Sequence, residues 1–150
     1  MYKILNIDGK EYKIEFTIEA SLYDEVITRT ISLMESLTSA STEKDMKTII
    51  GSMSDIPKTA LVMFYAGLLE YHGADGDGSV TSMEDTKRLV KLYFKEHAED
   101  ETGNFYGLMN MLIEQMGEDG FFKQIGLAQA SETVVNLQDH KKKKTAPSKN

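Results

Sequence analysis

The sequence has no cysteine and no tryptophan, and it contains no long apolar run. Without cysteine, neither a disulfide framework nor a thiolate metal site is possible. The longest apolar run, Ala60 to Leu69, is roughly half the length that a membrane-spanning helix needs. The first four residues, MYKI, show neither the apolar stretch nor the small-residue cleavage site of a secretory signal. We therefore expect no role in a membrane.

Motifs for nucleophilic, nucleotide and zinc chemistry are also missing. There is no G-x-S-x-G, no glycine-rich loop that ends in Gly-Lys-Ser/Thr, and no H-E-x-x-H. Of the three histidines, His72 and His97 close predicted helices, where a cation meets the negative end of the helix dipole, and His140 is in the tail. The acidic cluster 99–101 is typical of a solvated turn. We expect no enzyme, no cofactor and no metal site.

Charge is unevenly distributed along the chain, whose net charge is −7. Residues 131–150 carry five lysines against Glu132 and Asp139, a balance of +3, so the remaining 130 residues sum to −10. Phosphate backbones repel such an acidic body, which makes nucleic acid an unsuitable partner for it. The lysine-rich tail is most simply a solvated terminus.

Hydrophobic periodicity predicts a hairpin followed by helices. Two alternating runs, 2–7 and 11–16, flank Asp8-Gly9, a pair that suits the positive φ angles of a tight hairpin turn. Apolar residues then recur at helical spacing from Thr17 to Leu37, and the Ser/Thr-rich stretch 36–42 is expected to break this helix. A weaker segment, 43–53, precedes Pro57, which is expected in the first turn of a helix over 57–71.

Three more helices are expected beyond a Gly/Asp loop at 73–78. The first begins at Thr81 or Ser82, with Thr81 and Glu84 fitting a capping box, and includes Phe94. The others cover 104–116 and 121–130. The prediction is a mainly α fold over residues 1–130, in which an N-terminal β-hairpin precedes a compact bundle of about five to six helices. Residues 131–150 are expected to form a disordered basic tail.

Methionine and aromatic side chains are numerous in this chain, which has nine Met, seven Tyr and six Phe. In the predicted helix over 57–71, apolar side chains occur on all sides of the helix axis. This pattern indicates either a helix at the centre of the fold or one shared with a partner. Most of these residues are expected to pack in the core. Any remainder left at the surface forms a protein-binding patch, for which the candidates are Phe64, Tyr65, Phe105, Tyr106, Met109, Phe121 and Phe122.

The loop at 73–78 also permits a calcium hypothesis. With Gly78 at position six of an EF-hand loop, Asp75, Asp77 and Glu84 fall at positions three, five and twelve. Position one, however, is Gly73, so the first carboxylate ligand is missing. A degenerate EF-hand-like regulatory protein is therefore an alternative hypothesis, whereas a plain Gly/Asp turn is the default.

Three stretches resemble the tail assembly chaperones of siphophages that infect Gram-positive bacteria. They are 55–73 (DIPKTALVMFYAGLLEYHG), 77–90 (DGSVTSMEDTKRLV) and 103–123 (GNFYGLMNMLIEQMGEDGFFK). The resemblance runs from about residue 1 to residue 130. It is carried by the residues of these stretches and by their order along the chain, and it includes no catalytic motif. A further alternative in the same setting is a minor structural tail protein.

The resemblance implies a helical chaperone of the host cell cytoplasm that is absent from the finished virion. Such a protein binds the hydrophobic tape measure protein, keeps it soluble and helps to recruit tail tube subunits, and self-association is expected. Family members are often made in two lengths by a programmed ribosomal frameshift. Lys141 to Lys144 require AAA or AAG codons, on which a ribosome can slip, and an overlapping reading frame after these codons would test this expectation.

Overall fold

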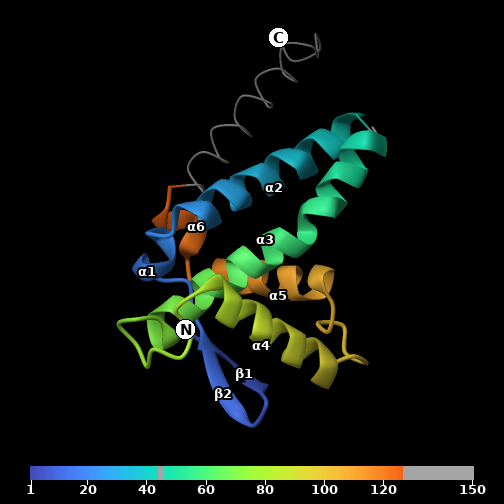
Figure 1. Cartoon of the computed structure of the whole chain (residues 1–150). Helices are drawn as coiled ribbons and strands as arrows, with labels where there is room; N and C mark the ends of the chain where they lie inside the picture. The colour runs from blue at the N-terminus through green and yellow to red at the C-terminus, as the bar shows by residue number, and fades with distance from the viewer. Residues whose placement is uncertain (44–45, 127–150) are drawn as a thin grey trace.

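The computed structural model describes residues 1–43 and 46–126, with the backbone alone for residues 34–53. Within these residues two strands precede six helices (Figure 1): β1 Lys3–Ile7, β2 Lys10–Ile14, α1 Ile18–Ser21, α2 Asp24–Glu43, α3 Met46–His72, α4 Met83–Glu96, α5 Phe105–Glu118 and α6 Phe121–Gln124. The expected mainly α fold with an N-terminal hairpin is confirmed. The expected basic tail, 131–150, lies outside the described residues.

The hairpin turns where the sequence predicts it. Asp8 and Gly9 have φ angles of 52° and 78°, and Ile7 pairs with Lys10 across the turn in an antiparallel ladder. Positive φ at both central residues gives the turn the twist that the strands need. One face of the hairpin is buried against the helices through Leu5, Ile7, Tyr12 and Ile14.

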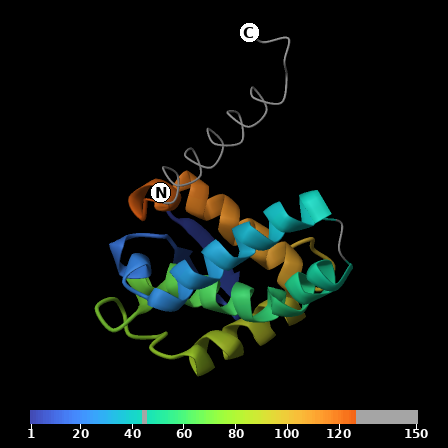
Figure 2. The same cartoon turned by 90° about the horizontal axis from the view of Figure 1, so that it is seen from above.

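Helix α3 is the centre of the fold. It contacts β2 and the helices α1, α2, α4 and α5 (Figure 1), and in Figure 2 its second half runs between α4 and α5. The apolar residues that surround its axis are therefore used within the chain: Ala60, Met63, Phe64, Ala66 and Leu68 are completely buried. A helix that is apolar all round is expected in such a central position.

Pro57 lies inside α3 and not in the first turn of a helix, which corrects the predicted boundary at 57 and the separate helix over 43–53. Proline has no backbone N–H, so the carbonyl four residues earlier loses its usual donor and the helix bends at such a position. The ribbon of α3 changes direction along its length (Figure 1). A bent helix can thus continue through a proline whose sequence context is typical of a helix start.

Two further predictions at the N-terminal helices are wrong. The single helix expected from Thr17 is divided, since α1 ends at Ser21 and α2 begins at Asp24. In addition, α2 continues through the Ser/Thr-rich stretch to Glu43. Hydroxyl side chains can bond to the carbonyl one turn back, as Thr28 and Thr30 do on this helix, and this satisfies them without ending it.

The boundaries of the last three helices differ from prediction by a few residues. Ser82 caps α4 by accepting from the backbone N–H of Asp85, whose carboxylate accepts from the N–H of Thr81 at 3.0 Å, so the predicted Thr81–Glu84 capping box is wrong. Glu84 pairs with Lys87 instead. The break expected from Gly117 comes two residues later, and α6 ends well before 130, with Gly126 at a φ of 83°.

Candidate interaction surface

Three of the seven predicted contact residues belong to the core. Phe64 and Phe121 are completely buried and Met109 is 4% exposed. Phe121 packs its ring against Phe16, with centroids 5.5 Å apart. Because a fully buried side chain cannot meet a partner without opening the fold, these three residues are corrected to core residues.

The other four predicted contact residues range from half-buried to exposed. Tyr65 packs edge-on against Tyr23, and Phe105 packs in the same way against Phe94. Phe122 is half-buried against the core. Only Tyr106, on α5, is fully at the surface, with 61% exposure.

Among the side chains that the structure describes, two strongly exposed large apolar ones are on α1, outside the seven predicted contact residues. Ile18 is 66% exposed, and Leu22, at the C-terminal cap of the same helix, is 70% exposed. They are four residues apart and therefore lie on one helical face. We call this pair the α1 patch. Leu22 falls inside the single helix expected from Thr17 to Leu37, and the division between α1 and α2 places it at a helix end instead.

Local hydrogen bonds fix the position of α1. Thr17 caps the helix, since its hydroxyl oxygen accepts from the N–H of Glu19, and the same hydroxyl donates to Glu70 on α3 at 2.6 Å. Ala20, on the opposite side from the α1 patch, is completely buried. The patch is thus held on a fixed turn, with its apolar side chains directed away from the core.

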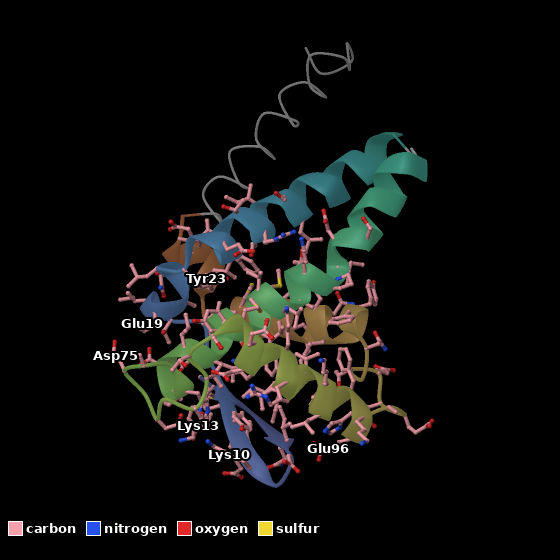
Figure 3. The ribbon with its side chains drawn as sticks, viewed as in Figure 1. Lys10, Lys13, Glu19, Tyr23, Asp75 and Glu96 are labelled. Carbon is pink, nitrogen blue, oxygen red and sulfur yellow. The ribbon has the colours of Figure 1, made fainter. Side chains whose placement is uncertain are left out.

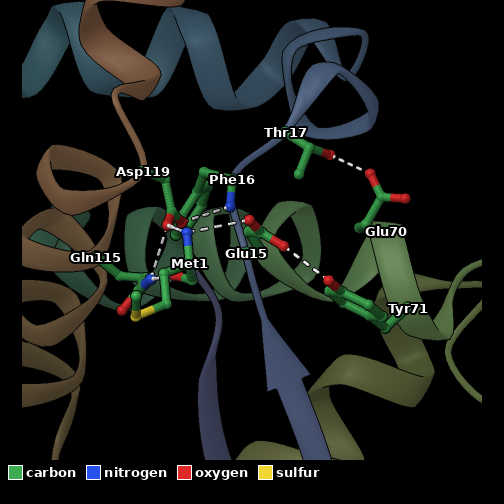
Figure 4. A network of polar contacts seen from close by, with 8 residues as sticks. All are labelled: Met1, Glu15, Phe16, Thr17, Glu70, Tyr71, Gln115 and Asp119. Carbon is green, nitrogen blue, oxygen red and sulfur yellow. Dashed lines mark hydrogen bonds and ion pairs between the residues drawn. The ribbon is translucent and has the colours of Figure 1, made fainter.

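The chain just before α1 is anchored by Asp119, whose side chain is 1% exposed (Figure 4). This carboxylate accepts from the backbone N–H of Phe16 at 2.8 Å and from the Gln115 amide at 2.9 Å. It also pairs with the Met1 ammonium at 3.0 Å. Hydrogen bonds to Asp119 and Glu15 raise the pKa of that ammonium. The network ties the N-terminus and the α1 connection to α5.

Acidic side chains border the α1 patch. Glu19 is on the helix itself, and Asp24 and Glu25 follow it at the start of α2. Figure 3 shows Glu19 beside α1, apart from the lysines Lys10 and Lys13 of the hairpin. Between residues 14 and 29 the sequence holds no lysine or arginine. The charged residues of the segment 15–28, which includes the patch, are therefore all acidic.

A smaller apolar group lies on the outer face of the hairpin. Tyr2 and Ile4 are each 42% exposed. The ring of Tyr2 packs edge-on against Tyr71, and the Lys13 ammonium lies 4.8 Å from the Tyr2 ring centroid. A hydrogen bond to Glu15, together with partial burial, raises the pKa of Tyr71 to about 12. The Tyr2 ring is engaged with Tyr71 and Lys13, so it is less available than the α1 patch.

The loop proposed for calcium is used for internal bonds. Asp77 accepts at Oδ1 from the backbone N–H and the hydroxyl of Ser79, and its Oδ2 lies 2.9 Å from His72 Nδ1. Partial burial alone would raise the pKa of Asp77, but the bonds from Ser79 and His72 outweigh it and hold this pKa well below its usual range. The oxygens that calcium requires from Asp77 are therefore already bonded.

Metal ligands do not gather in this loop. Across the residues that the structure describes, there is no group of three or more histidine, aspartate or glutamate side chains placed to hold a metal ion. Glu84, the supposed twelfth position, pairs with Lys87 at 3.1 Å. The loop over 73–78 therefore does not present the assembled ligand set that the calcium hypothesis requires. The plain Gly/Asp turn agrees with the geometry.

Comparisons with known proteins give no relative. A scan against protein-family models, a search of curated proteins and a search of solved structures each found no match. Within the described residues, no helix has both the length and the apolar character required to cross a membrane.

Proposed function

We propose that this chain is a bacteriophage tail assembly chaperone, a non-enzymatic protein that binds the tape measure protein and helps to recruit tail tube subunits. The observation that carries the proposal is the α1 patch, because its two large apolar side chains, Ile18 and Leu22, are 66% and 70% exposed on one helical face. Exposed apolar surface next to polar residues is typical of protein-binding sites. The resemblance of three sequence stretches to this family gives the partner.

The physical task is to keep a long apolar helix soluble in water. An acidic protein that covers such a helix removes apolar surface from solvent and adds negative charge, and both effects oppose aggregation. The body of this chain, with −10 over residues 1–130, suits that task. Each copy needs only modest affinity, because many copies along one partner reinforce one another.

Self-association supports the same task, and the hairpin offers a route to it. The sheet has two strands. The outer edge of β2 is occupied by α3, since Glu15 donates to the carbonyl of Gly67 and Lys13 donates to His72. β1 has no strand on its outer side within the described residues. Pairing of β1 edges between copies is the proposed contact, and a light-scattering mass that stays monomeric across concentrations would rule it out.

The proposed site of action is the host cell cytoplasm before the tail is complete. A minor structural tail protein is the neighbouring hypothesis, and it differs in one observable. A chaperone is absent from purified phage particles, whereas a structural subunit is present in them at a fixed copy number. Mass spectrometry of purified particles therefore separates the two roles.

Co-expression tests the proposed function itself. The tape measure gene from the same phage is expressed alone, with this chain, and with an unrelated acidic helical protein of similar size. We expect the tape measure protein in the soluble fraction only when this chain is present. Equal solubility with the unrelated protein would show that charge alone suffices and would remove the proposed role.

A further inference from the structure

The α1 patch is shaped for one kind of partner. Ile18 and Leu22 are separated by one helical turn, so together they form a short ridge of apolar side chains. A helix presents grooves of matching spacing between its own side chains. A partner strand would instead need free backbone groups, and the backbone of α1 is bonded within its own turn, for example from the N–H of Leu22 to the carbonyl of Ile18. The ridge therefore favours a helical occupant.

The charges around the ridge decide which helix fits. Glu25 is paired with Arg29, and Arg29 also faces Asp55, so this cation is already neutralised. By contrast, the carboxylates of Glu19 and Asp24 form no ion pair within the described structure and remain available. A lysine or arginine beside an apolar stripe meets these two carboxylates when the stripe covers the ridge.

We propose that the α1 patch binds an amphipathic helix whose apolar stripe is flanked by lysine or arginine residues. This inference rests on the proposed function and deepens it, because it assigns the site and the chemistry of the helical segment that the chaperone covers. A second copy of this chain brings the same acidic border and is repelled, as is an anionic membrane surface. A positively charged helix is therefore attracted to the α1 patch, whereas a second copy of this chain and an anionic membrane are repelled.

Peptide binding tests the proposal with a defined probe. The probe is a fluorescein-labelled 18-residue helical peptide that has a leucine stripe flanked by lysines. The matched peptide keeps the stripe and has glutamate in place of every lysine. Fluorescence anisotropy is measured with the full chain at low salt. We expect the lysine peptide to bind at least tenfold more tightly than the glutamate peptide, and equal binding of the two would overturn the proposal.

Variants then locate the site. Ile18→Ser with Leu22→Ser should weaken binding of the lysine peptide by at least tenfold, because two apolar anchors are lost. Tyr106→Ser, which removes an equally exposed side chain on α5, should leave binding unchanged. Circular dichroism melts serve as the folding check, since all three positions are at the surface and the melting temperature should not move. Equal loss in the Tyr106 variant would place the site elsewhere and overturn the proposal.

A second pair of variants tests the charged border. Glu19→Gln with Asp24→Asn should weaken binding about fivefold at low salt and reduce its salt dependence. Glu99→Gln with Glu101→Gln removes the same net charge from an exposed turn far along the chain and should have little effect. If both pairs weaken binding equally, the attraction comes from overall charge and the assignment to α1 is wrong.

These outcomes can be told apart from failure of the proposed function. If the tape measure protein is solubilised equally well by the Ile18/Leu22 variant, the chaperone role stands and the α1 site is wrong. If the lysine peptide binds at α1 but the tape measure protein stays insoluble, the site stands and the chaperone role is wrong.

Discussion

The ring of His72 joins the last turn of α3 to the second strand of the hairpin, because the backbone N–H of Lys13 donates to His72 Nε2 at 2.9 Å. The ring is buried and packs against Tyr12, with centroids 5.0 Å apart. A nitrogen that accepts a hydrogen bond carries no proton, so Nδ1 is the protonated nitrogen and donates to Asp77. One histidine thus connects the helix, the hairpin and the following loop.

Replacing His72 tests this junction. His72→Phe keeps a ring of similar shape but leaves the N–H of Lys13 without an acceptor, which should lower the free energy of unfolding by about 1–3 kcal/mol in urea titrations. His97→Phe is the matched control, because His97 is partly exposed and its bond to Asp100 is at the surface. It should cost roughly 0.5 kcal/mol or less. Equal effects at the two positions would contradict the junction.

Asp77 should make stability depend on acid pH. Its folded pKa lies below the usual value of about 3.9, so its contribution to stability is fully present above that value and disappears as pH falls through the folded pKa. The stability difference between the wild type and Asp77→Asn should therefore shrink as pH falls from 5 to 3. Asp75→Asn, in the same exposed loop, is the control for loss of one carboxylate in the same urea titrations.

The corrected core position of Phe121 gives a direct stability test. Phe121→Ala should lower the free energy of unfolding by about 3–5 kcal/mol, because the fully buried ring against Phe16 is lost and a cavity is left. Tyr106→Ala should change it by roughly 0.5 kcal/mol or less. If the Phe121 variant unfolds at the wild-type urea concentration, this residue is not a core residue.

The start of α4 offers a test of the cap assignment. Ser82→Ala should destabilise the protein by about 1 kcal/mol, since the N–H of Asp85 loses its acceptor. Glu84→Gln should have little effect, because this carboxylate pairs only with exposed Lys87. A larger fall in melting temperature for Glu84→Gln than for Ser82→Ala would instead support the Thr81–Glu84 capping box.

Local signals in the sequence predicted the elements whose cause is local. Asp8-Gly9 predicted the hairpin because its turn needs positive φ at both residues, and the apolar spacing over 104–116 predicted α5, which Asn104 caps by accepting from the N–H of Gly107. The helix start predicted at Pro57 is wrong, because a proline in the first turn of a helix and a proline inside a bent helix give the same local sequence pattern. Tertiary packing on both sides of α3 decides between them.

The candidate surface was less predictable than the fold. The predicted contact residues were mostly aromatic, and two of them, Phe64 and Phe121, are completely buried in the core. The exposed pair on α1 depends on a break between Ser21 and Asp24 that periodicity does not show. One signal was available, since the segment 15–28 combines apolar residues with acids and has no base.

The most direct test of the central claim is the soluble fraction of the tape measure protein when it is co-expressed with wild-type chain, with Ile18→Ser/Leu22→Ser, or with Tyr106→Ser. The account predicts a soluble partner with the wild type and with the Tyr106 variant, and a return towards the level of the partner alone with the Ile18/Leu22 variant. A tape measure protein that remains as insoluble with the wild-type chain as without it would contradict the account.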